Sequence, residues 1–524
     1  MMEKLEGKWY EVYEKSRVLW ENKDYDEAQK ILEDFWEKTK IKTLPQTVLY
    51  AYILRSKREY ITLINFVKET LEIFKNAKEL NLLAILLSIL AESYQRIGKT
   101  KKAAKIFLKS AEIEPNVEKK LTEISNAVFA RGASDFSAKE MDFFYEKYRS
   151  VLKELNAKPY EKVKYSHKKI RVGYLSADLH NHPVSDFSAA LFLNYNPDKF
   201  IIYVYNLGNA LDEVTKILKS GGGIWRDVFN LSFSKIADMI RGDEIDILVD
   251  LSGHTSKNAL PVFKYKPAAL QISGIGYVLS TGLRETDGFL TDIYTAPEVN
   301  SPYFTEKLYR LNHSHFCYTP FKNFPEISTL PYLKNGYVTF GSFNNFSKVT
   351  DEVLIIWNEI LNKIPHSKMI LKHSLFDSVE GLQYTKKRME LLGISAEKFE
   401  FRGFGENYLS EYSDIDIALD TFPYNGGATS LEALMMGVPV VTLGGNRHGS
   451  RFGVSFLKNL NLNELIAKNE KNYVEIAVTL ASDTELLASL RKSLRNIMLN
   501  SPLMDRNNYM KELEKLYENI LKCV

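Results

Sequence analysis

The stretch DIALDTFPYNGGATSLEALMMGVPVVTL, residues 416–443, predicts a strand, a glycine loop, a helix and a second strand. The apolar runs at its two ends have the length of buried strands, and Thr429 to Met436 has helical spacing. Between the first strand and the helix, Gly426 and Gly427 allow a tight backbone path. This order of elements is typical of a parallel sheet covered by helices.

The same loop predicts an anion site. A glycine loop that leads into a helix leaves backbone N–H groups without partners at the positive end of the helix dipole, which suits a diphosphate. Thr429 and Ser430 would add hydroxyl groups there. Two interpretations of Glu432 stay open: it accepts a hydrogen bond from the ribose of a nucleotide-sugar, or it closes a T-x-x-E capping box with Thr429.

Composition describes an ordinary globular protein. The chain has 524 residues, 45% of them hydrophobic and 26% charged, and a net charge of +3 gives no reason to expect nucleic acid or an anionic membrane as a partner. Cys317 and Cys523 form no C-x-x-C pair, so neither a disulfide framework nor a cysteine zinc site is expected. The N-terminus resembles no signal peptide and no window is apolar enough for a membrane span, which makes the cytoplasm the expected location.

Residues 1–116 predict tetratricopeptide-like helical repeats. Helical spacing dominates, the small residues Ala103 and Ala104 allow two helices to approach closely, and Gly98 marks a turn between them. A plain helical bundle is the alternative. Residues 117–168 are predicted to be a helical connector that ends in a basic, irregular stretch.

After residue 168 short β-branched runs alternate with helical segments, which predicts parallel α/β layers. We expect two Rossmann-like lobes, residues 169–330 and 331–524, with an aromatic and proline-rich linker at 316–333 between the two sets of strands. A cleft between two such lobes is a common ligand site. The predicted strands are 170–175, 200–205, 245–251 and 269–275 in the first lobe, and 338–340, 369–372, 400–402, 415–419 and 438–443 in the second.

Four polar residues follow predicted strands and are candidates for the cleft. His182 could donate or accept a proton near neutral pH, and Lys348 could neutralise charge on a departing diphosphate. His254 and Thr281 could line the same cleft. The structural alternatives are a histidine bonded to a backbone carbonyl, a solvated loop lysine and an ordinary surface turn.

No metal site is predicted. The acidic pair Asp414 and Asp416 lies at the start of its strand, away from the edge where a metal–nucleotide complex would bind. The diphosphate charge would then be neutralised by a lysine, hydroxyl groups and a helix N-terminus, without a metal cofactor.

Taken together, these segments resemble the catalytic region of the O-linked N-acetylglucosamine transferase / SPINDLY family. The sequences DTFPY at 420–424 and GSFNN at 341–345 look closer to the SPINDLY branch than to the animal N-acetylglucosamine enzymes. The resemblance implies a GT-B fold, here preceded by an all-α tetratricopeptide-like domain, and an inverting, metal-independent glycosyltransferase that uses a UDP- or GDP-linked sugar. The segments that match in order and spacing are 125–129, 170–183, 336–348, 416–442 and 465–469.

Residue roles follow from the same resemblance. By position, His182 matches the active-site histidine, Asn345 and Lys348 match diphosphate contacts, and Glu432 matches the ribose-binding acid. Gly426, Gly427, Thr429 and Ser430 fall in the loop that carries phosphate contacts. Two departures lie near the donor: Val278 stands where the family usually has proline, and Gly427 where it often has histidine or threonine.

The expected function is therefore transfer of a hexose, such as GlcNAc or fucose, from a nucleotide-sugar to Ser/Thr hydroxyls of a protein or peptide acceptor held by the helical repeats. Two alternatives stay open. One is the same donor chemistry with a non-protein acceptor. The other is a helical-repeat scaffold without catalytic activity.

Overall fold

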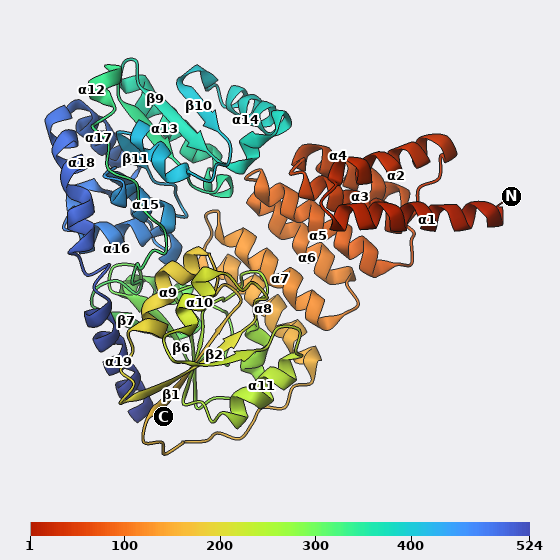
Figure 1. Cartoon of the computed structure of the whole chain (residues 1–524), viewed down its shortest axis with the longest axis horizontal. Helices are drawn as coiled ribbons and strands as arrows, with labels where there is room; N and C mark the ends of the chain where they lie inside the picture. Colours follow the sequence, from red (N-terminus) through yellow and green to blue (C-terminus); the bar gives the residue numbers. More distant parts are fainter. Residues whose placement is uncertain (1, 524) are drawn as a thin grey trace.

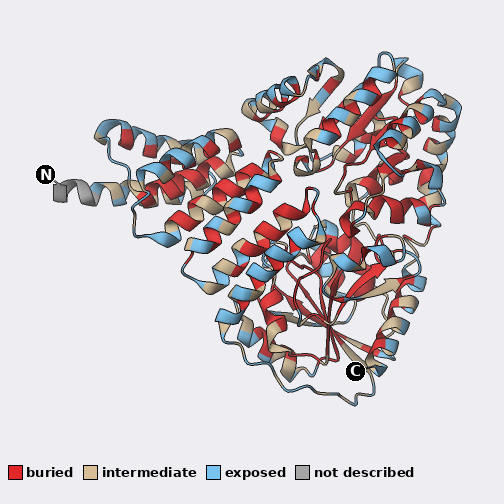
Figure 2. Ribbon diagram, turned by 180° about the vertical axis from the view of Figure 1, so that it is seen from behind, coloured by how far each residue is buried: buried red, intermediate tan, exposed pale blue. Residues whose placement is uncertain are grey.

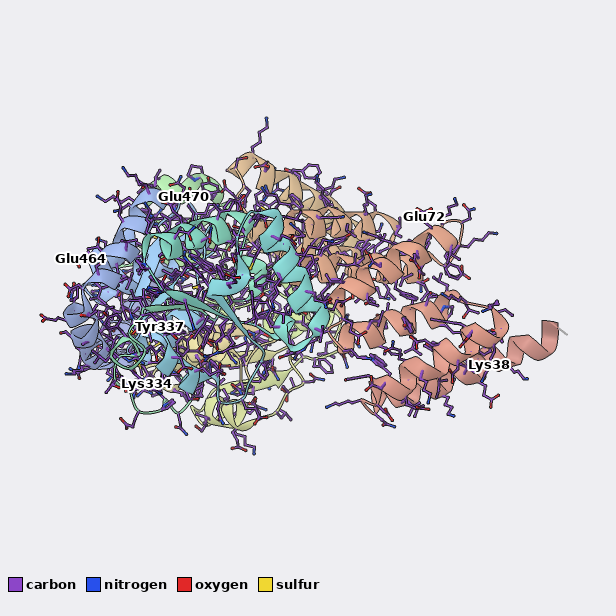
Figure 3. All side chains as sticks on the ribbon, turned by 90° about the horizontal axis from the view of Figure 1, so that it is seen from above. Lys38, Glu72, Lys334, Tyr337, Glu464 and Glu470 are labelled. Atoms are coloured by element: carbon purple, nitrogen blue, oxygen red, sulfur yellow. The ribbon has the colours of Figure 1, made fainter. Side chains whose placement is uncertain are left out.

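The computed structural model describes residues 2–523, and its first part consists of helices that pack successively, as in stacked helical repeats (Figure 1). Seen from above, these helices project away from the rest of the chain, with Lys38 and Glu72 toward the outer end (Figure 3). Their bounds are α1 (Met2–Glu21), α2 (Tyr25–Thr39), α3 (Leu44–Ser56), α4 (Tyr60–Ile73), α5 (Leu80–Arg96), α6 (Thr100–Ile113), α7 (Val117–Gly132) and α8 (Ala138–Leu152), followed by the 3-10 turn η1 (Lys153–Leu155).

The turn between α5 and α6 shows why helical repeats could be predicted from the sequence. Gly98 has a φ of +83°, a left-handed conformation that glycine adopts without steric cost. Ala103 and Ala104 are buried, and their small side chains let α6 approach α5 closely. The buried hydroxyl of Ser110 donates a hydrogen bond of 2.8 Å to the carbonyl of Ala84 on α5. The helical repeat prediction is confirmed.

The first lobe is a seven-stranded parallel sheet in the order β3-β2-β1-β4-β5-β6-β7. Its inner strand β1 pairs in parallel with β2, and the register places Ile170 opposite Phe200. Helices cover the sheet, and its strands are largely buried (Figure 2). The bounds are β1 (Ile170–Ser176), α9 (Pro183–Leu193), β2 (Phe200–Asn206), α10 (Glu213–Lys219), β3 (Ile224–Asp227), α11 (Phe233–Gly242), β4 (Ile247–Asp250), η2 (Leu260–Tyr265), β5 (Leu270–Gly274), β6 (Gly288–Asp292), η3 (Glu298–Tyr303) and β7 (Lys307–Leu311).

The second lobe is a six-stranded parallel sheet in the order β10-β9-β8-β11-β12-β13. Its elements are α12 (Tyr332–Asn335), β8 (Thr339–Ser342), η4 (Phe346–Lys348), α13 (Asp351–Lys363), β9 (Lys368–Lys372), η5 (Ser374–Asp377), α14 (Val379–Leu391), η6 (Ala396–Lys398), β10 (Phe399–Arg402), η7 (Tyr408–Asp414), β11 (Ile417–Leu419), α15 (Ala428–Met435), β12 (Val440–Leu443), η8 (His448–Ser450), α16 (Phe452–Asn459), η9 (Asn463–Leu465), β13 (Ile466–Ala467), α17 (Glu470–Ser482), α18 (Thr484–Leu499) and α19 (Arg506–Lys522). Two parallel-sheet lobes after a helical region match the predicted GT-B arrangement.

None of the helices within residues 2–523 combines the length and apolar composition needed to cross a membrane.

The last helix, α19, leaves the second lobe and packs beside β7 and α9 of the first (Figure 1). The hydroxyls of Tyr517 on α19 and Tyr174 on β1 are 3.4 Å apart, and Glu514 accepts a hydrogen bond of 2.6 Å from the backbone of Asn196. The range predicted for the second lobe, 331–524, therefore includes a helix that lies on the first lobe.

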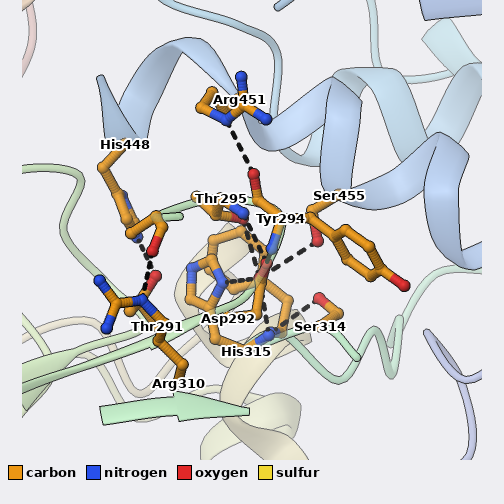
Figure 4. A network of polar contacts seen from close by, with 12 residues as sticks. Thr291, Asp292, Tyr294, Thr295, Arg310, Ser314, His315, His448, Arg451 and Ser455 are labelled. Carbon is orange, nitrogen blue, oxygen red and sulfur yellow. Dashed lines mark hydrogen bonds and ion pairs between the residues drawn. The ribbon is translucent and has the colours of Figure 1, made fainter. Parts of the chain in front are cut away.

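A buried polar network also joins the lobes (Figure 4). Asp292, at the end of β6, accepts hydrogen bonds from His315 Nδ1 at 2.5 Å and from Ser455 Oγ on α16 at 3.1 Å. His448 of the second lobe lies 3.1 Å from the hydroxyl of Thr291 through its Nε2 atom. These contacts fix the position of the two sheets whose carboxyl edges meet at the candidate site.

The helical repeats contact the second lobe. Arg58 forms an ion pair of 2.9 Å with Asp377, and Glu380 accepts a hydrogen bond of 2.6 Å from the backbone N–H of Thr62 near the start of α4. The turn at Gly98 packs against Arg388 of α14. The repeats and the second lobe thus enclose the space next to the carboxyl ends of β8 and β11.

Candidate active site

Three segments converge at the carboxyl edges of the two sheets. The N-terminus of α9 follows β1, the short η4 turn follows β8, and α15 follows β11. The two lobes face each other here, because a Cβ atom placed on Gly427 would lie 3.8 Å from the ring of Phe187 on α9. The sequence placed His182, Lys348 and Thr429 on these three segments, and the structure brings the segments together.

Asp420 holds the glycine loop in place. Its buried carboxylate accepts hydrogen bonds from the backbone N–H groups of Gly426 at 2.7 Å and Thr421 at 2.9 Å, and from the hydroxyl of Thr442 at 2.7 Å. Burial raises the pKa of Asp420 to about 6. No role for Asp420 is predicted from the sequence, although an acid at the end of a buried strand just before a glycine loop indicates such a contact.

Gly426 lies in a crowded position. A Cβ atom there would lie 2.3 Å from Ser430 Oγ and 2.9 Å from Asn344 Oδ1, so these side chains would have to move to make room for it. The hydroxyl of Thr429 donates to Asn344 Oδ1 at 3.0 Å, which links the loop to the end of β8. This role of Asn344 was not predicted, because the resemblance pointed to the neighbouring Asn345.

Helix α15 starts at Ala428, with Gly427 as its N-cap and no side chain capping it. Within the described residues, the backbone N–H groups of Ala428 and Thr429 have no hydrogen-bond partner. The helix dipole places partial positive charge on these groups. This end of α15 therefore has the donors that a phosphate group requires.

Lys348 is half-buried beside this loop. Its ammonium group donates a hydrogen bond of 2.8 Å to the carbonyl of Asn425 and lies 3.8 Å from the centre of the Tyr424 ring. Burial lowers the pKa of Lys348 to about 8, and the negative charge of Asp420 acts in the opposite direction. Asn345 is exposed, and its side-chain oxygen accepts from the backbone N–H of Ser347 at 3.1 Å, which caps η4.

His182 is the N-cap of α9. Its Nδ1 atom accepts a hydrogen bond of 3.3 Å from the backbone N–H of Val184. In the neutral imidazole, the proton then resides on Nε2, and that atom is a hydrogen-bond donor. Burial lowers the pKa of His182, so this neutral form prevails at neutral pH. The geometry favours a positioning donor over a general base.

Glu432 closes no capping box, and that interpretation is wrong. Thr429 lies inside the helix, and the carboxylate of Glu432 instead pairs with the ammonium group of Lys322 and accepts a hydrogen bond of 2.6 Å from the hydroxyl of Tyr408. Neither partner was predicted, because Lys322 belongs to an irregular linker and Tyr408 to a 3-10 turn. A ribose role for Glu432 stays a prediction.

The predictions for His254 and Thr281 are wrong, because both residues are fully buried. His254 lies 2.9 Å from Ser125 Oγ through Nδ1 and 2.8 Å from the carbonyl of Thr281 through Nε2, and burial lowers its pKa to about 4. The hydroxyl of Thr281 donates to Glu306 at 2.5 Å. Helices α7 and α8 cover this end of the first sheet, so the loops here pack into the core.

No group of three or more His, Cys, Asp or Glu side chains within the described residues is arranged as a metal site. A cavity of about 590 Å³ lies beside the glycine loop, between the start of α6 and the second lobe. Its lining includes Lys102, Asp135, Thr350, Pro423 and Leu443.

Comparisons with known proteins agree with this geometry. The model of glycosyl transferase family 41 matches residues 132–331 and 328–513. A protein from Petunia hybrida described as a probable UDP-N-acetylglucosamine–peptide N-acetylglucosaminyltransferase SPINDLY is 39% identical over 357 residues, which are 67% of this chain and 38% of that protein. The Arabidopsis thaliana SPINDLY protein is 39% identical over 361 residues, 67% of this chain and 39% of that protein. The matches thus span about two fifths of these curated relatives. A solved structure of a Thermobaculum terrenum O-GlcNAc transferase mutant superposes with a TM-score of 0.84 at 25% identity and covers 98% of each chain.

Proposed function

Because this chain belongs to glycosyl transferase family 41, we propose that it is an inverting, metal-independent glycosyltransferase that moves a hexose from a UDP- or GDP-linked sugar to Ser/Thr hydroxyls of a protein. The observation that carries the proposal is the hydrogen bond between Lys348 and the carbonyl of Asn425. It holds a cation beside a loop that leads into the uncapped N-terminus of α15.

Departure of the nucleoside diphosphate is the step that this arrangement supports. The acceptor oxygen attacks the anomeric carbon, and the bond from that carbon to the phosphate oxygen breaks on the opposite face. Its electron pair stays on the diphosphate, where negative charge develops. Lys348 and the free N–H groups of Ala428 and Thr429 are donors fixed in advance, and one such donor typically contributes ~10²–10³ in rate.

His182 has a supporting role in this proposal. With Nδ1 engaged by the backbone of Val184, its Nε2–H group can donate a hydrogen bond to an oxygen of the sugar or of the acceptor. It orients the reactants, and the acceptor proton leaves to the departing diphosphate or to water.

The cavity between α6 and the second lobe is the place proposed for the acceptor polypeptide. Pro423 on its wall directly precedes Tyr424 and Asn425, which contact Lys348. Helical repeats offer concave surfaces suited to an extended chain. A cytoplasmic location is part of the proposal and is supported by two free cysteines, the buried Cys317 and the exposed Cys523.

A melting-temperature screen of UDP, GDP and their sugars tests the donor half of the proposal. A ligand present at ~100 times its dissociation constant adds ~2.7 kcal/mol of stability. Intact-mass analysis of peptides and of non-protein acceptors then separates the two glycosyltransferase hypotheses. A chain that binds no nucleotide would favour the scaffold hypothesis.

A further inference from the structure

The cavity between the repeats and the second lobe has an uneven distribution of charge. A lysine cluster lines it at the start of α6 and consists of Lys99, Lys101 and Lys102. The acidic residues of the lining are spread over three other segments: the turn between α7 and α8 with Asp135, the start of α13 with Asp351 and Glu352, and the start of α17 with Glu470. Positive charge is therefore concentrated at one place in the cavity.

Asp351, the acid in contact with the lysine cluster, already has two cationic partners. Its carboxylate accepts a hydrogen bond of 2.6 Å from Arg388 Nε and lies 3.5 Å from the ammonium group of Lys99. The side chain of Arg388 also lines the cavity and is 5% exposed, and its Nη1 atom has no hydrogen-bond partner among the described residues. One carboxylate thus faces two cations, which leaves positive charge in excess.

Lys101 and Lys102 add to this excess. Both are exposed, and neither forms an ion pair with a residue that the structure describes; the ammonium group of Lys102 lies 4.2 Å from the centre of the Tyr94 ring. Helix α6 has Lys99 as its N-cap without a side-chain cap, and within residues 2–523 the backbone N–H groups of Thr100 and Lys101 have no partner. The helix dipole places partial positive charge on these groups. An anion at this place would meet ammonium and backbone donors together.

The start of α6 lies close to the segment that carries Lys348. A Cβ atom on Gly98 would lie 3.5 Å from the carbonyl oxygen of Phe346 and 3.6 Å from that of Val349, which lie on either side of Lys348 in the chain. Pro423, on the wall of the same cavity, precedes the loop that Lys348 contacts. An acceptor segment whose hydroxyl reaches Lys348 therefore has neighbouring side chains within reach of the lysine cluster.

A carboxylate is the side-chain group of a polypeptide that fits this place, because it accepts hydrogen bonds from ammonium and backbone N–H groups and carries the opposite charge. We propose that the lysine cluster selects acceptor segments that carry an Asp or Glu close to the modified Ser or Thr. The dispersed acids of the lining would repel the same side chain elsewhere in the cavity, which favours one register of the segment. This inference rests on the proposed function, since it requires a polypeptide acceptor in this cavity.

The test compares peptides that differ in one side chain. Each peptide has one Ser in a neutral background, and Asp, Asn or Lys is placed in turn at each position on either side of it. Sugar transfer by the whole chain is followed by intact mass, with the donor that the melting-temperature screen selects. At one position or two adjacent ones, kcat/KM should be about fivefold higher for Asp than for Asn, the size expected of two exposed ion pairs. The ratio should shrink in about 0.5 M NaCl, because salt screens exposed charges.

The double variant Lys101→Glu/Lys102→Glu should reverse the preference, so that Lys exceeds Asn at the same position. Each ratio compares two peptides with one protein, and a general loss of activity therefore cancels. Lys105→Glu/Lys109→Glu is the matched control, because it makes the same change of charge further along α6 and outside the cavity lining; it should keep the preference for Asp. If the reversed-charge variant does not fold, Lys101→Met/Lys102→Met replaces it and should remove the preference.

The failures are distinguishable. Equal kcat/KM for the Asp, Asn and Lys peptides at every position would overturn the role of the lysine cluster and leave the proposed function standing. A preference for Asp that persists unchanged in Lys101→Glu/Lys102→Glu, or a wild-type preference for Lys, would do the same. Absence of sugar transfer to any of the peptides would overturn both.

Discussion

Lys348 donates a hydrogen bond to the backbone carbonyl of Asn425, 2.8 Å away, and so ties the loop after β8 to the loop before α15. A neutral carbonyl leaves the positive charge of the lysine uncompensated by direct contact. Asp420 is the acid whose charge acts on Lys348, and its carboxylate already accepts hydrogen bonds from Gly426, Thr421 and Thr442. The charge is thus available to an incoming diphosphate.

Replacing Lys348 with alanine should nearly abolish turnover while the protein stays folded. The substitution removes one preorganised cation from the leaving group, which typically costs ~10²–10³ in rate. Single-turnover transfer assays and a melting curve measure the two effects. The matched control is Lys368→Ala, because Lys368 also lies over a tyrosine ring of the second lobe, that of Tyr337 at 4.9 Å, but on the outer surface. Near-normal turnover in a folded Lys348→Ala protein would remove the basis of the assignment.

The kcat/KM for the donor should fall as pH rises through about 8. Burial lowers the pKa of Lys348 to that value, and the protonated form is the one that stabilises the diphosphate. Asp420 favours the charged lysine, so Asp420→Asn should move this limb of the profile to lower pH. A profile that stays flat up to pH 10 would contradict the role of Lys348.

Activity should persist in excess EDTA. The proposed leaving-group stabilisation uses Lys348 and the N-terminus of α15, and neither needs a divalent cation. The measurement is initial rate with and without chelator, with later addition of Mg²⁺ or Mn²⁺. Loss of activity that either metal restores would show that a metal takes part.

Filling the cavity beside the repeats should impair acceptor modification and spare donor chemistry. Asp135 lines this cavity and its side chain is 84% exposed, so Asp135→Trp adds bulk without disturbing the core. We expect acceptor glycosylation to fall at least about tenfold, equivalent to ~1.4 kcal/mol, with donor hydrolysis unchanged. Glu464→Trp, on an exposed turn far from the repeats in Figure 3, is the control. Full acceptor glycosylation in Asp135→Trp would place the polypeptide elsewhere.

Much of the fold was readable from the sequence because its inner strands are continuous apolar runs. The predicted strands at 170–175 and 438–443 correspond to β1 and β12. Strands β3 and β13 were missed, and both are short strands at a sheet edge. Strands β6 and β7 were also missed: Gly288–Asp292 is short and starts with glycine, and Lys307–Leu311 is an edge strand with polar residues. Neither has the uninterrupted β-branched pattern that marks a central strand.

Site residues could be predicted only where they directly follow a strand along the chain. His182 and Lys348 follow strands directly, and the parallel topology brings strand ends together. His254 has the same local signal, but α7 and α8 cover it, and such packing between distant segments leaves no trace in a single sequence. Lys322 was missed for the converse reason, since an irregular segment carries it across the lobes to Glu432.

The most direct test of the account is intact-mass analysis of acceptor peptides incubated with UDP- and GDP-linked sugars, using the wild-type protein and Lys348→Ala in parallel. We expect that one donor adds a single sugar residue to a Ser- or Thr-containing peptide, and that the addition disappears in Lys348→Ala. Absence of sugar transfer from every donor to any peptide would contradict the account, as would equal transfer by Lys348→Ala.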